Sequence, residues 1–295
     1  MIAITGATGH VGGMVMSNLL NGGVQARELT AVVRNRDKAQ WIAERGVEIR
    51  FADYDKPESL PQAFEGVETL LFISSSSRDD RQRIVQHRAV VEAAAKAQVK
   101  HIVYTSFIDA HPPSPFHGAE VHQVTERLIM DGGMGWTLLR NGAYTDFLLM
   151  MSGPAIERGA LTTASRVGHV SYVAREDIAR AASAVLREPA GHDRKVYVLT
   201  GPESLSQEDI AGVLSRVSAK NVEYRLVSEH EYVKHMANAM NMPVEAAAGF
   251  LGMTRAIEIG RMSYISDDVE ILTGRPAQRV EEFLRRAQAA GSPHA

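Results

Sequence analysis

The chain opens with Met1-Ile2-Ala3-Ile4-Thr5-Gly6-Ala7-Thr8-Gly9-His10-Val11-Gly12, a short apolar stretch that runs directly into three evenly spaced glycines. Gly6 allows a sharp exit from a strand, Gly9 lets backbone N–H groups approach a pyrophosphate, and Gly12 lets a helix pack closely on that strand. A helix-compatible stretch, Gly13–Leu20, follows, so a pyrophosphate would lie at the positive end of a helix. The stretch therefore predicts a dinucleotide-binding turn, with a tight structural turn as the alternative. The same turn supplies the further candidate cofactor-binding residues Thr8, His10 and Val11.

Strand-like and helix-like stretches alternate through the first two thirds of the chain. The short apolar or β-branched runs are Ile2–Thr5, Leu29–Arg34, Glu48–Ala52, Thr69–Ile73, His101–Thr105 and Gly135–Leu139. The helix-compatible stretches between them are Lys38–Arg45, Glu58–Phe64, Gln82–Ala97 and Gly118–Met130. Alternation with short connections predicts an α/β fold, a Rossmann-type doubly wound parallel sheet with helices on both faces.

The pattern loosens from about Gly142, which predicts a smaller, discontinuous α/β region at the C-terminal side. We expect residues 1–141 to form the NAD(P)-binding domain, with segments of about 170–200 returning to it, and residues 142–295 to form mainly the substrate-binding region. The helices expected there are Tyr144–Ser152, Pro154–Arg158, Arg175–Leu186 and Ser206–Ser218, and the strands are Lys195–Leu199 and Val222–Leu226.

A methionine-rich helical region follows and contains Met236, Met240, Met242 and Met253. Methionines at such spacings are commonly filler in an apolar core, because the side chain is unbranched and adaptable. The same side chains could line an adaptable apolar pocket in a small domain that closes over a cofactor. The sequence leaves both interpretations open.

The composition narrows the class of protein and its partners. The 295 residues carry a formal net charge of −3, which gives no polyanion-binding field and predicts no nucleic-acid partner. The absence of cysteine removes disulfides, thiolate metal sites and cysteine nucleophiles, and no other metal-binding pattern occurs. Because the first strand begins at Ile2 and no apolar run approaches the length of a membrane span, we expect a cytoplasmic protein without a membrane partner. The oligomeric state stays open, a homodimer included.

The residue at the end of the second strand predicts the cofactor. NAD-specific sites place an acid there, which accepts from the ribose 2′-hydroxyl, whereas NADP sites place a cation. Here the strand ends in Arg34, whose planar donors match a phosphate, and the first acid is Asp37. We therefore predict NADPH, with Lys38 as a second cation. The alternative is that Arg34 is a solvated surface charge.

Further motifs follow the glycine turn in a fixed order. The spacing G-x-x-G-x-x-G replaces the G-x-G-x-x-G of ordinary dehydrogenases and resembles the extended and atypical short-chain dehydrogenase/reductases. The other motifs are Val33-Arg34-Asn35, Ala52-Asp53-Tyr54-Asp55, Phe72-Ile73-Ser74-Ser75-Ser76, Tyr104-Thr105-Ser106 and Leu138-Leu139-Arg140-Asn141-Gly142-Ala143-Tyr144. Together they resemble the NmrA-like atypical short-chain reductases, and within that group the bacterial flavin-independent NAD(P)H:quinone oxidoreductases and triphenylmethane dye reductases. The resemblance covers nearly the whole chain and weakens after about Gln207.

Three strand ends supply the remaining candidate cofactor residues. The resemblance implies that Asp53 holds the adenine amino group, the alternative being an aspartate in a turn. Ser74 and Ser75 end the fourth strand, and we expect their backbone beside the nicotinamide ribose, because ligands in open α/β sheets bind at the carboxyl ends of strands. A merely flexible serine run is the alternative there. Thr105 and Ser106, at the end of the fifth strand, complete the predicted cofactor site.

Ordinary short-chain dehydrogenases carry Tyr-x-x-x-Lys on the helix after the fifth strand, and no such pair occurs here. The corresponding stretch supplies His122 and Glu126, four residues apart, so that the carboxylate could orient or charge the imidazole. A solvated surface pair is the alternative. Asn141 and Tyr144, in the turn after the sixth strand, are the candidates to shape an acceptor pocket and to hydrogen-bond a carbonyl oxygen. The alternative is that Asn141 only forms a turn and that Tyr144 only packs in the core.

Loss of the tyrosine–lysine pair disfavours alcohol oxidation, in which a base must remove a hydroxyl proton. It fits an acceptor that needs a hydride and collects its proton from water. We therefore predict an NADPH-dependent, flavin-independent oxidoreductase that transfers hydride directly to a small apolar acceptor, a quinone first and a triphenylmethane dye second. The alternative is a non-catalytic NAD(P)-binding redox sensor of the NmrA type, since both lack the pair.

Overall fold

The computed structural model describes residues 1–290. These residues form two compact units, each built from separate stretches of the chain. The first unit comprises Met1–Ala110, Glu120–Arg140 and Arg175–Val198, and the second comprises His111–Ala119, Asn141–Ala174 and the described residues from Leu199 onward. Across residues 1–290, no helix combines the length and the apolar character needed to cross a lipid bilayer.

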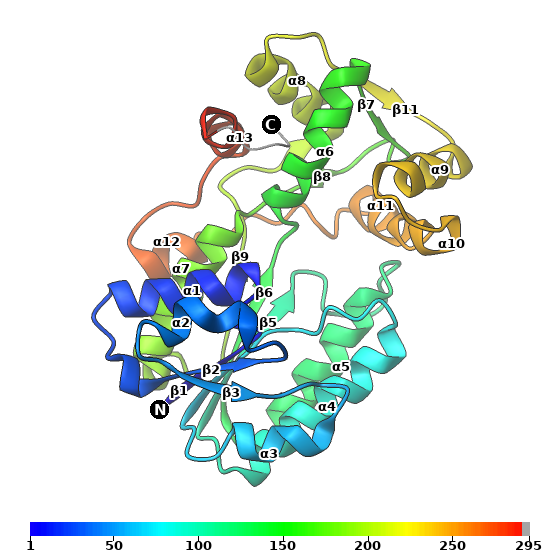
Figure 1. The fold of residues 1–295 in the computed structure, drawn as a ribbon. Coiled ribbons are helices and arrows are strands. Elements are labelled where there is room, and N and C mark those ends of the chain that lie inside the picture. Colours follow the sequence, from blue (N-terminus) through cyan, green and yellow to red (C-terminus); the bar gives the residue numbers. More distant parts are fainter. Residues whose placement is uncertain (291–295) are drawn as a thin grey trace. The chain divides into compact units, whose positions relative to one another are not determined.

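A seven-stranded sheet forms the centre of the first unit, with the strand order β3-β2-β1-β4-β5-β6-β9 (Figure 1). Strand β1 pairs in parallel with β2 and β4, β2 pairs in parallel with β3, and β4 with β5. The strands are β1 (Ile2–Thr5), β2 (Leu29–Val33), β3 (Glu48–Phe51), β4 (Thr69–Phe72), β5 (His101–Phe107), β6 (Gly135–Asn141) and β9 (Lys195–Leu199). The predicted Rossmann-type fold is confirmed, and each of these seven strands begins at the expected residue.

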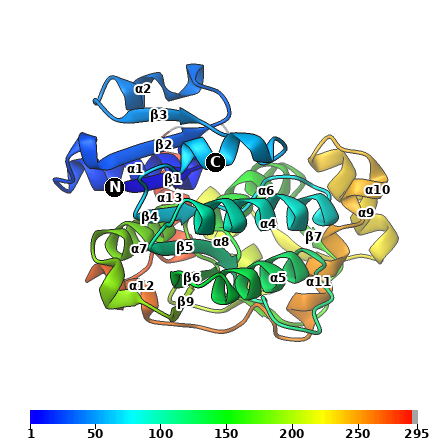
Figure 2. The same cartoon turned by 90° about the horizontal axis from the view of Figure 1, so that it is seen from below.

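Helices cover both faces of this sheet, which is why its inner strands β1, β2, β4 and β5 are almost wholly buried. Helices α1 and α7 pack against each other on one face, and α3, α4 and α5 cover the other, where Figures 1 and 2 show α4 and α5 side by side. The helices are α1 (His10–Asn21), α2 (Gln40–Ala43), α3 (Leu60–Ala63), α4 (Asp80–Lys96), α5 (Gly118–Asp131) and α7 (Arg175–Arg187). Four 3-10 helices accompany them: η1 (Ala26–Glu28), η2 (Asp37–Ala39), η3 (Pro57–Ser59) and η4 (Pro189–His192).

The second unit contains two small sheets and seven helices in its described part. Strand β11 pairs in parallel with β7, and β10 pairs antiparallel with β8. The strands are β7 (Ala160–Thr163), β8 (His169–Val170), β10 (Leu205–Ser206) and β11 (Glu223–Leu226). The helices are α6 (Thr145–Arg158), α8 (Gln207–Ser218), α9 (Glu229–Ala239), α10 (Val244–Ala247), α11 (Phe250–Glu258), α12 (Asp268–Thr273) and α13 (Val280–Ala289).

One prediction for this unit needs correction, and three of its strands, β7, β8 and β10, were not predicted. The helical pieces Tyr144–Ser152 and Pro154–Arg158 form the single helix α6, with Pro154 inside it. Proline breaks a helix by removing one N–H donor and crowding the preceding turn, but here the apolar face of α6 packs into a core, which offsets that cost. Strand β7 was not predicted, because its four residues carry no strong period of their own and pair with β11, about 60 residues later.

The methionine-rich region forms an apolar cluster of its own. Met236 is buried beside Tyr232 and Val233, and Met240 and Met242 pack against the same cluster. The rings of Phe147 and Phe250, at its edge, stack with their centroids 5.9 Å apart. For Met236, Met240 and Met242 the structure therefore favours the core interpretation over a pocket lining.

Candidate functional site

The glycine turn leaves backbone groups open at the first helix of the chain. Gly6 adopts a left-handed conformation with a φ of 59°, and the Gly9 N–H donates to its carbonyl oxygen over 2.8 Å. A Cβ on Gly12 would overlap that same carbonyl, so the close approach of α1 to the turn requires glycine there. Gly9 begins α1 without a side-chain cap, which leaves the first N–H groups of the helix available to an anion.

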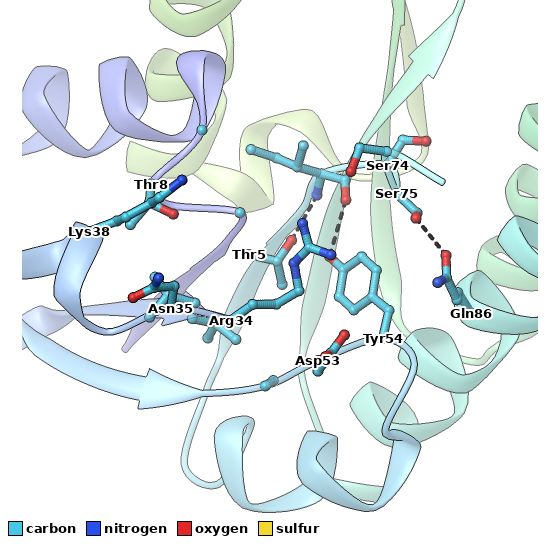
Figure 3. A pocket seen from close by; sticks show the side chains of 17 residues that line it. Thr5, Thr8, Arg34, Asn35, Lys38, Asp53, Tyr54, Ser74, Ser75 and Gln86 are labelled. Atoms are coloured by element: carbon cyan, nitrogen blue, oxygen red, sulfur yellow. Dashed lines mark hydrogen bonds between the residues drawn. The ribbon is translucent and has the colours of Figure 1, made fainter. Parts of the chain in front are cut away.

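A cavity of about 360 Å³ lies beside this turn, at the carboxyl ends of β1 to β4 (Figure 3). In a parallel sheet this edge is where ligands bind. The lining residues are Thr5, Gly6, Thr8, Gly9, Val32, Val33, Arg34, Asn35, Lys38, Ala52, Asp53, Tyr54, Ile73, Ser74, Ser75, Ser76 and Gln86.

Most predicted cofactor residues lie on this lining, and the others lie on α1 or β5. The lining includes Gly6, Thr8, Gly9, Arg34, Asp53, Ser74 and Ser75. His10, Val11 and Gly12 form the first turn of α1. Thr105 supports the wall from behind, since its hydroxyl accepts from the Ser74 N–H over 3.0 Å, and the Ser106 hydroxyl donates to Glu126.

The lining also contains residues that the sequence analysis missed. The Tyr54 hydroxyl donates to the Ile73 carbonyl over 3.1 Å, and burial raises the pKa of this phenol. The Gln86 amide donates to Asp55 over 2.6 Å, and its oxygen accepts from the Ser75 hydroxyl. Of these two residues, only Tyr54 could have been predicted from its neighbours in the sequence, because it follows Asp53 at the end of a strand.

The charges around the cavity fit a dinucleotide that carries a 2′-phosphate. Arg34 is exposed at the end of β2, and Lys38 follows it in η2, so two cations border the cavity. Asp53 is the acid on the lining, at the end of β3. Guanidinium groups match phosphate oxygens in geometry and charge, whereas a ribose hydroxyl at the same place would call for an acid.

The serine run after β4 is held by hydrogen bonds rather than left as a flexible segment. The Ser75 N–H donates to His87 Nε2 over 2.9 Å, and the Ser77 N–H donates to the Ser75 hydroxyl over 3.1 Å. Asp79 then caps α4 by accepting from two backbone N–H groups of its first turn. The backbone beside the cavity is thereby fixed in place.

His87 is held in its neutral form. Because the Ser75 N–H can only donate, His87 Nε2 accepts, and Nδ1 therefore carries the hydrogen and donates to the Thr125 hydroxyl over 2.8 Å. The Thr125 hydroxyl donates in turn to the Val121 carbonyl. Burial, and second the Arg83 guanidinium, lower the pKa of His87 to about 3.

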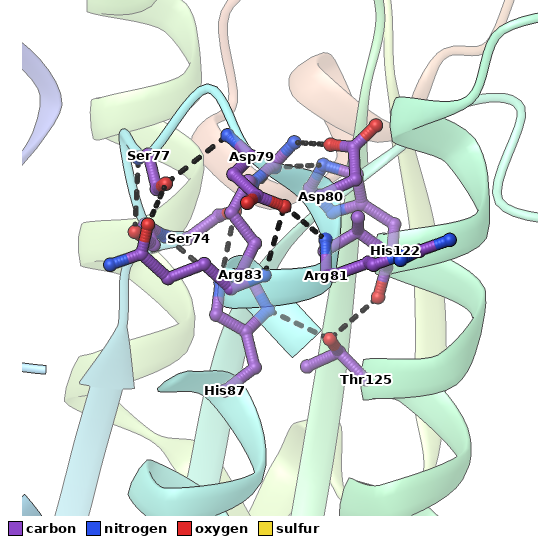
Figure 4. A network of polar contacts seen from close by, with 12 residues as sticks. Ser74, Ser77, Asp79, Asp80, Arg81, Arg83, His87, His122 and Thr125 are labelled. Carbon is purple, nitrogen blue, oxygen red and sulfur yellow. Dashed lines mark hydrogen bonds and ion pairs between the residues drawn. The ribbon is translucent and has the colours of Figure 1, made fainter. Parts of the chain in front are cut away.

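His122 lies in the same polar network (Figure 4). Its Nδ1 is 2.8 Å from the Tyr104 hydroxyl, and its Nε2 is 3.4 Å from an Arg83 nitrogen. Burial is the main cause that holds the pKa of His122 well below its ordinary value, followed by the positive charge of Arg83 and by His87. The Phe107 ring lies beside the imidazole, with centroids 5.9 Å apart.

The predicted interaction between His122 and Glu126 does not form. Glu126 is buried and accepts two hydrogen bonds from Arg140, at 2.9 and 2.6 Å, as well as one from the Ser106 hydroxyl. The reason is competition, because a bidentate guanidinium on β6 is a stronger partner for a buried carboxylate than a neutral imidazole one helical turn away. His122 and Glu126 therefore belong to separate sets of contacts.

Asn141 and Tyr144 come together in the second unit. Asn141 is buried at the end of β6, and its Nδ2 is 3.5 Å from the Tyr144 hydroxyl. Its Oδ1 is also buried and has no hydrogen-bond partner among the described residues. Gly142 fixes the turn between them, since a Cβ there would lie 2.7 Å from the Ser171 carbonyl oxygen.

Comparison with known proteins agrees with this geometry. A family described as NAD(P)H-binding matches residues 6–189. The chain is 42% identical over 232 residues to quinone oxidoreductase 2 of Escherichia coli, covering 79% of each chain. It is 31% identical to the NAD(P)H azoreductase of Xenophilus azovorans, over 98% of this chain and 99% of that one. The crystal structure of Citrobacter sp. triphenylmethane reductase complexed with NADP(H) matches with a TM-score of 0.91 and 40% identity, over 97% of this chain and 100% of that one.

Proposed function

The chain belongs to the NAD(P)H-binding family, and from that premise we propose that it is an NADPH-dependent reductase of small apolar acceptors, quinones first and triphenylmethane dyes second. The observation that carries the proposal is the combination, in one cavity, of an open glycine turn with Arg34 at the end of β2. The names of the relatives support the reaction class, since they include a quinone oxidoreductase, an azoreductase and a triphenylmethane reductase.

Different residues of the first unit would bind different parts of the cofactor. The N-terminus of α1 would hold the pyrophosphate, because its first N–H groups have no side-chain cap, and Gly6 and Gly9 would shape the turn beside it. Arg34, assisted by Lys38, would bind the 2′-phosphate, and Asp53 the adenine amino group. Ser74 and Ser75 would border the nicotinamide end. When bound, NADPH supplies a hydride.

The polar groups nearby favour an acceptor that needs no strong acid from the protein. Glu126 is bonded to Arg140 and Ser106, and His122 is held neutral, so neither is poised to donate a proton. A quinone or a cationic dye fits this arrangement, because it accepts a hydride and can take any proton it needs from water. Positioning and the exclusion of water would then account for most of the rate.

Asn141 and Tyr144 are our candidates for contact with the acceptor. The amide of Asn141 is buried, and its Oδ1 has no partner among the described residues, so a ligand hydroxyl or N–H group could donate to it. The Tyr144 ring would add apolar surface and a hydroxyl. Both residues would act on the KM of the acceptor rather than on the affinity for NADPH.

The test is an acceptor panel assayed with NADPH and with NADH. Quinones, triphenylmethane dyes, azo dyes and aldehydes are each mixed with the purified protein, and loss of reduced-nicotinamide absorbance is followed. We expect fast oxidation of NADPH with at least one quinone, slower oxidation with dyes, and none with aldehydes. Binding of NADPH without oxidation by any acceptor would instead support the redox-sensor function.

Two further proposals concern the cellular location and the oligomeric state of the protein. We propose that the protein acts in the cytoplasm and associates as a homodimer. Cell fractionation tests the first expectation, and light scattering of the purified protein tests the second. A monomer with full activity would show that the dimer is not needed for function.

A further inference from the structure

Arg83 is a partly buried guanidinium that the proposed function does not use. It extends from α4, where one terminal nitrogen pairs with Asp80 over 3.1 Å. Its other terminal nitrogen donates to the Ser74 hydroxyl over 3.1 Å and lies 3.4 Å from His122 Nε2 (Figure 4). Its Nε is buried and has no partner among residues 1–290. An unpaired buried donor carries a cost, and such costs concentrate where the arrangement serves a site.

The chemistry of arginine fixes the direction of these hydrogen bonds. A guanidinium has only donors, so His122 Nε2 must accept from it, and the hydrogen of the neutral imidazole must lie on Nδ1. Nδ1 then donates to the Tyr104 hydroxyl, 2.8 Å away. On the other side, the Ser74 oxygen accepts from Arg83, so the hydrogen of that hydroxyl can donate either to His87 Nε2, 3.4 Å away, or to a group in the cavity. Ser74 lines the cavity.

We propose that Arg83 is a positioning residue of the reductase: its guanidinium orients the Ser74 hydroxyl at the cavity and holds His122 as a neutral donor to Tyr104, so that no imidazolium takes part in turnover. The inference rests on the proposed function for its effect on catalysis. The state of His122, by contrast, can be tested without any turnover. Arg83 acts through Ser74 and His122 and does not itself touch the ligand.

The groups that face His122 agree with a neutral imidazole. From α4 it meets the cation Arg83 and the neutral His87, and from β5 it meets the buried phenol Tyr104. The carboxylates nearby are engaged elsewhere, since Asp80 pairs with Arg83 and Glu126 pairs with Arg140 on β6. Among the described residues, no carboxylate forms a hydrogen bond with His122, so nothing stabilises a positive charge on it.

This arrangement determines where the proton of the reduced acceptor comes from. The acceptor gains its electron pair with the hydride, and where the product also needs a proton, water supplies it. The Ser74 hydroxyl turns its hydrogen from His87 Nε2 to a ligand oxygen and donates a hydrogen bond without losing that hydrogen. His122 keeps one hydrogen throughout. Turnover should therefore show no ionisation of an essential histidine between about pH 6 and 8.

The experiment replaces Arg83 and follows both the imidazole and the rate. In the cofactor-free wild type, nitrogen NMR should show His122 neutral, with the hydrogen on Nδ1, between about pH 6 and 8. In Arg83→Met we expect the pKa of His122 to rise, while burial still holds it below its ordinary value. We expect kcat to fall roughly 10- to 100-fold and to become more dependent on pH. Arg83→Lys keeps the charge and should restore the low pKa of this imidazole and the flat pH profile.

The matched control is Arg81→Met, which removes an exposed charge two residues away on α4. It should leave the NMR signals and kcat unchanged. If Arg83→Met does not fold, Ser74→Ala and His122→Asn replace it. We expect Ser74→Ala to lower kcat and His122→Asn, which keeps a donor near Tyr104, to retain it.

Two results would overturn the proposal. One is an imidazolium at His122 in the wild type at neutral pH, and the other is unchanged kcat and pH dependence in Arg83→Met. Failure of the proposed function looks different. In that case no acceptor oxidises NADPH in the wild type, while the NMR experiment still gives the neutral Nδ1–H form and its change on removal of Arg83.

Discussion

The glycine turn and the histidine network lie at the same edge of one sheet but are built in opposite ways. At the turn, Gly6, Gly9 and Arg34 are exposed and the first N–H groups of α1 have no side-chain cap. In the network, His87 and His122 each use both ring nitrogens in contacts within the protein. The hydrogen-bond donors of α1 in the first region are available to a ligand, whereas the ring nitrogens of the second region are engaged in contacts within the protein.

That difference separates residues that bind a ligand from residues that maintain the structure around it. Groups with open donors bind, and changes to them should act directly on ligand affinity. Groups with satisfied donors hold a shape, and changes to them should act on stability or modestly on rate. Histidines near a cofactor edge are therefore not catalytic by their position alone.

The strongest test of the binding region is Gly9→Val, which should abolish binding of NADPH and NADH. A branched side chain would occupy the space that the pyrophosphate needs. The fold should survive, because Gly9 is exposed and has an ordinary φ of −83°. Its Cβ would lie a tight 3.2 Å from the Gly6 carbonyl oxygen, so the turn must shift by a few tenths of an ångström. Fluorescence titration measures the affinity. Gly13→Ala is the control, since its Cβ would lie at an ordinary 3.5 Å from the nearest atom. Unchanged cofactor affinity in Gly9→Val would show that the turn has only a structural role.

Arg34→Glu should weaken NADPH roughly 10- to 100-fold and leave NADH nearly unchanged, because a charge-assisted bond to the 2′-phosphate contributes about 1.5–3 kcal/mol. Dissociation constants for both cofactors give the answer. Arg36→Glu is the matched control, an exposed arginine in the same loop that does not line the cavity. An equal loss for both cofactors would contradict the assignment of Arg34.

Glu126→Gln tests the buried pair on the network side and should lower the free energy of unfolding by about 2 kcal/mol. This loss is smaller than the usual cost of breaking a buried ion pair, because the Arg140 side chain keeps 25% of its surface exposed to solvent. Urea unfolding measures the loss. Turnover per folded molecule should stay near wild type, and a selective loss of turnover with stability unchanged would return Glu126 to the catalytic candidates.

His122→Ala should lower turnover only about fivefold, as expected for a lost neutral hydrogen bond of about 1 kcal/mol. Steady-state kinetics with one good quinone, at varied NADPH and varied quinone, measures the change. Loss of a general acid or base typically costs about 10²–10⁴-fold. A decrease beyond about a thousandfold in a folded variant would make this imidazole the proton donor.

The smallest expected effect is the contribution of His87 to the pH dependence of stability. Its pKa is about 3 in the folded protein against an ordinary 6.5, so the unfolded chain binds the proton first as the pH falls. The stability linked to the neutral form is complete above about pH 6.5 and is lost progressively toward pH 3, by less than about 1 kcal/mol between pH 7 and 6. Urea unfolding of the wild type and His87→Gln should show a flatter profile in the variant. Parallel profiles would mean that His87 titrates normally.

Local signals made the fold and the binding region predictable from sequence. The glycine turn, the strand starts and the cation at the end of β2 each depend on residues that are neighbours in the chain. The network depends on contacts across the fold, such as Gln86 with Asp55, 31 residues apart, and Arg83 with His122, 39 residues apart. The four-residue spacing of His122 and Glu126 suggested a pair, but it could not reveal that Arg140 competes for the carboxylate.

The interleaving of the two units restricts how this molecule can be recombined. The chain passes from one unit to the other between residues 110 and 111, 119 and 120, 140 and 141, 174 and 175, and 198 and 199. No single junction therefore divides a gene for this protein into one complete unit and another. A chimera that exchanges the second unit for that of a relative needs several crossovers, so the two halves of the molecule are inherited together and must diversify by substitution rather than by shuffling.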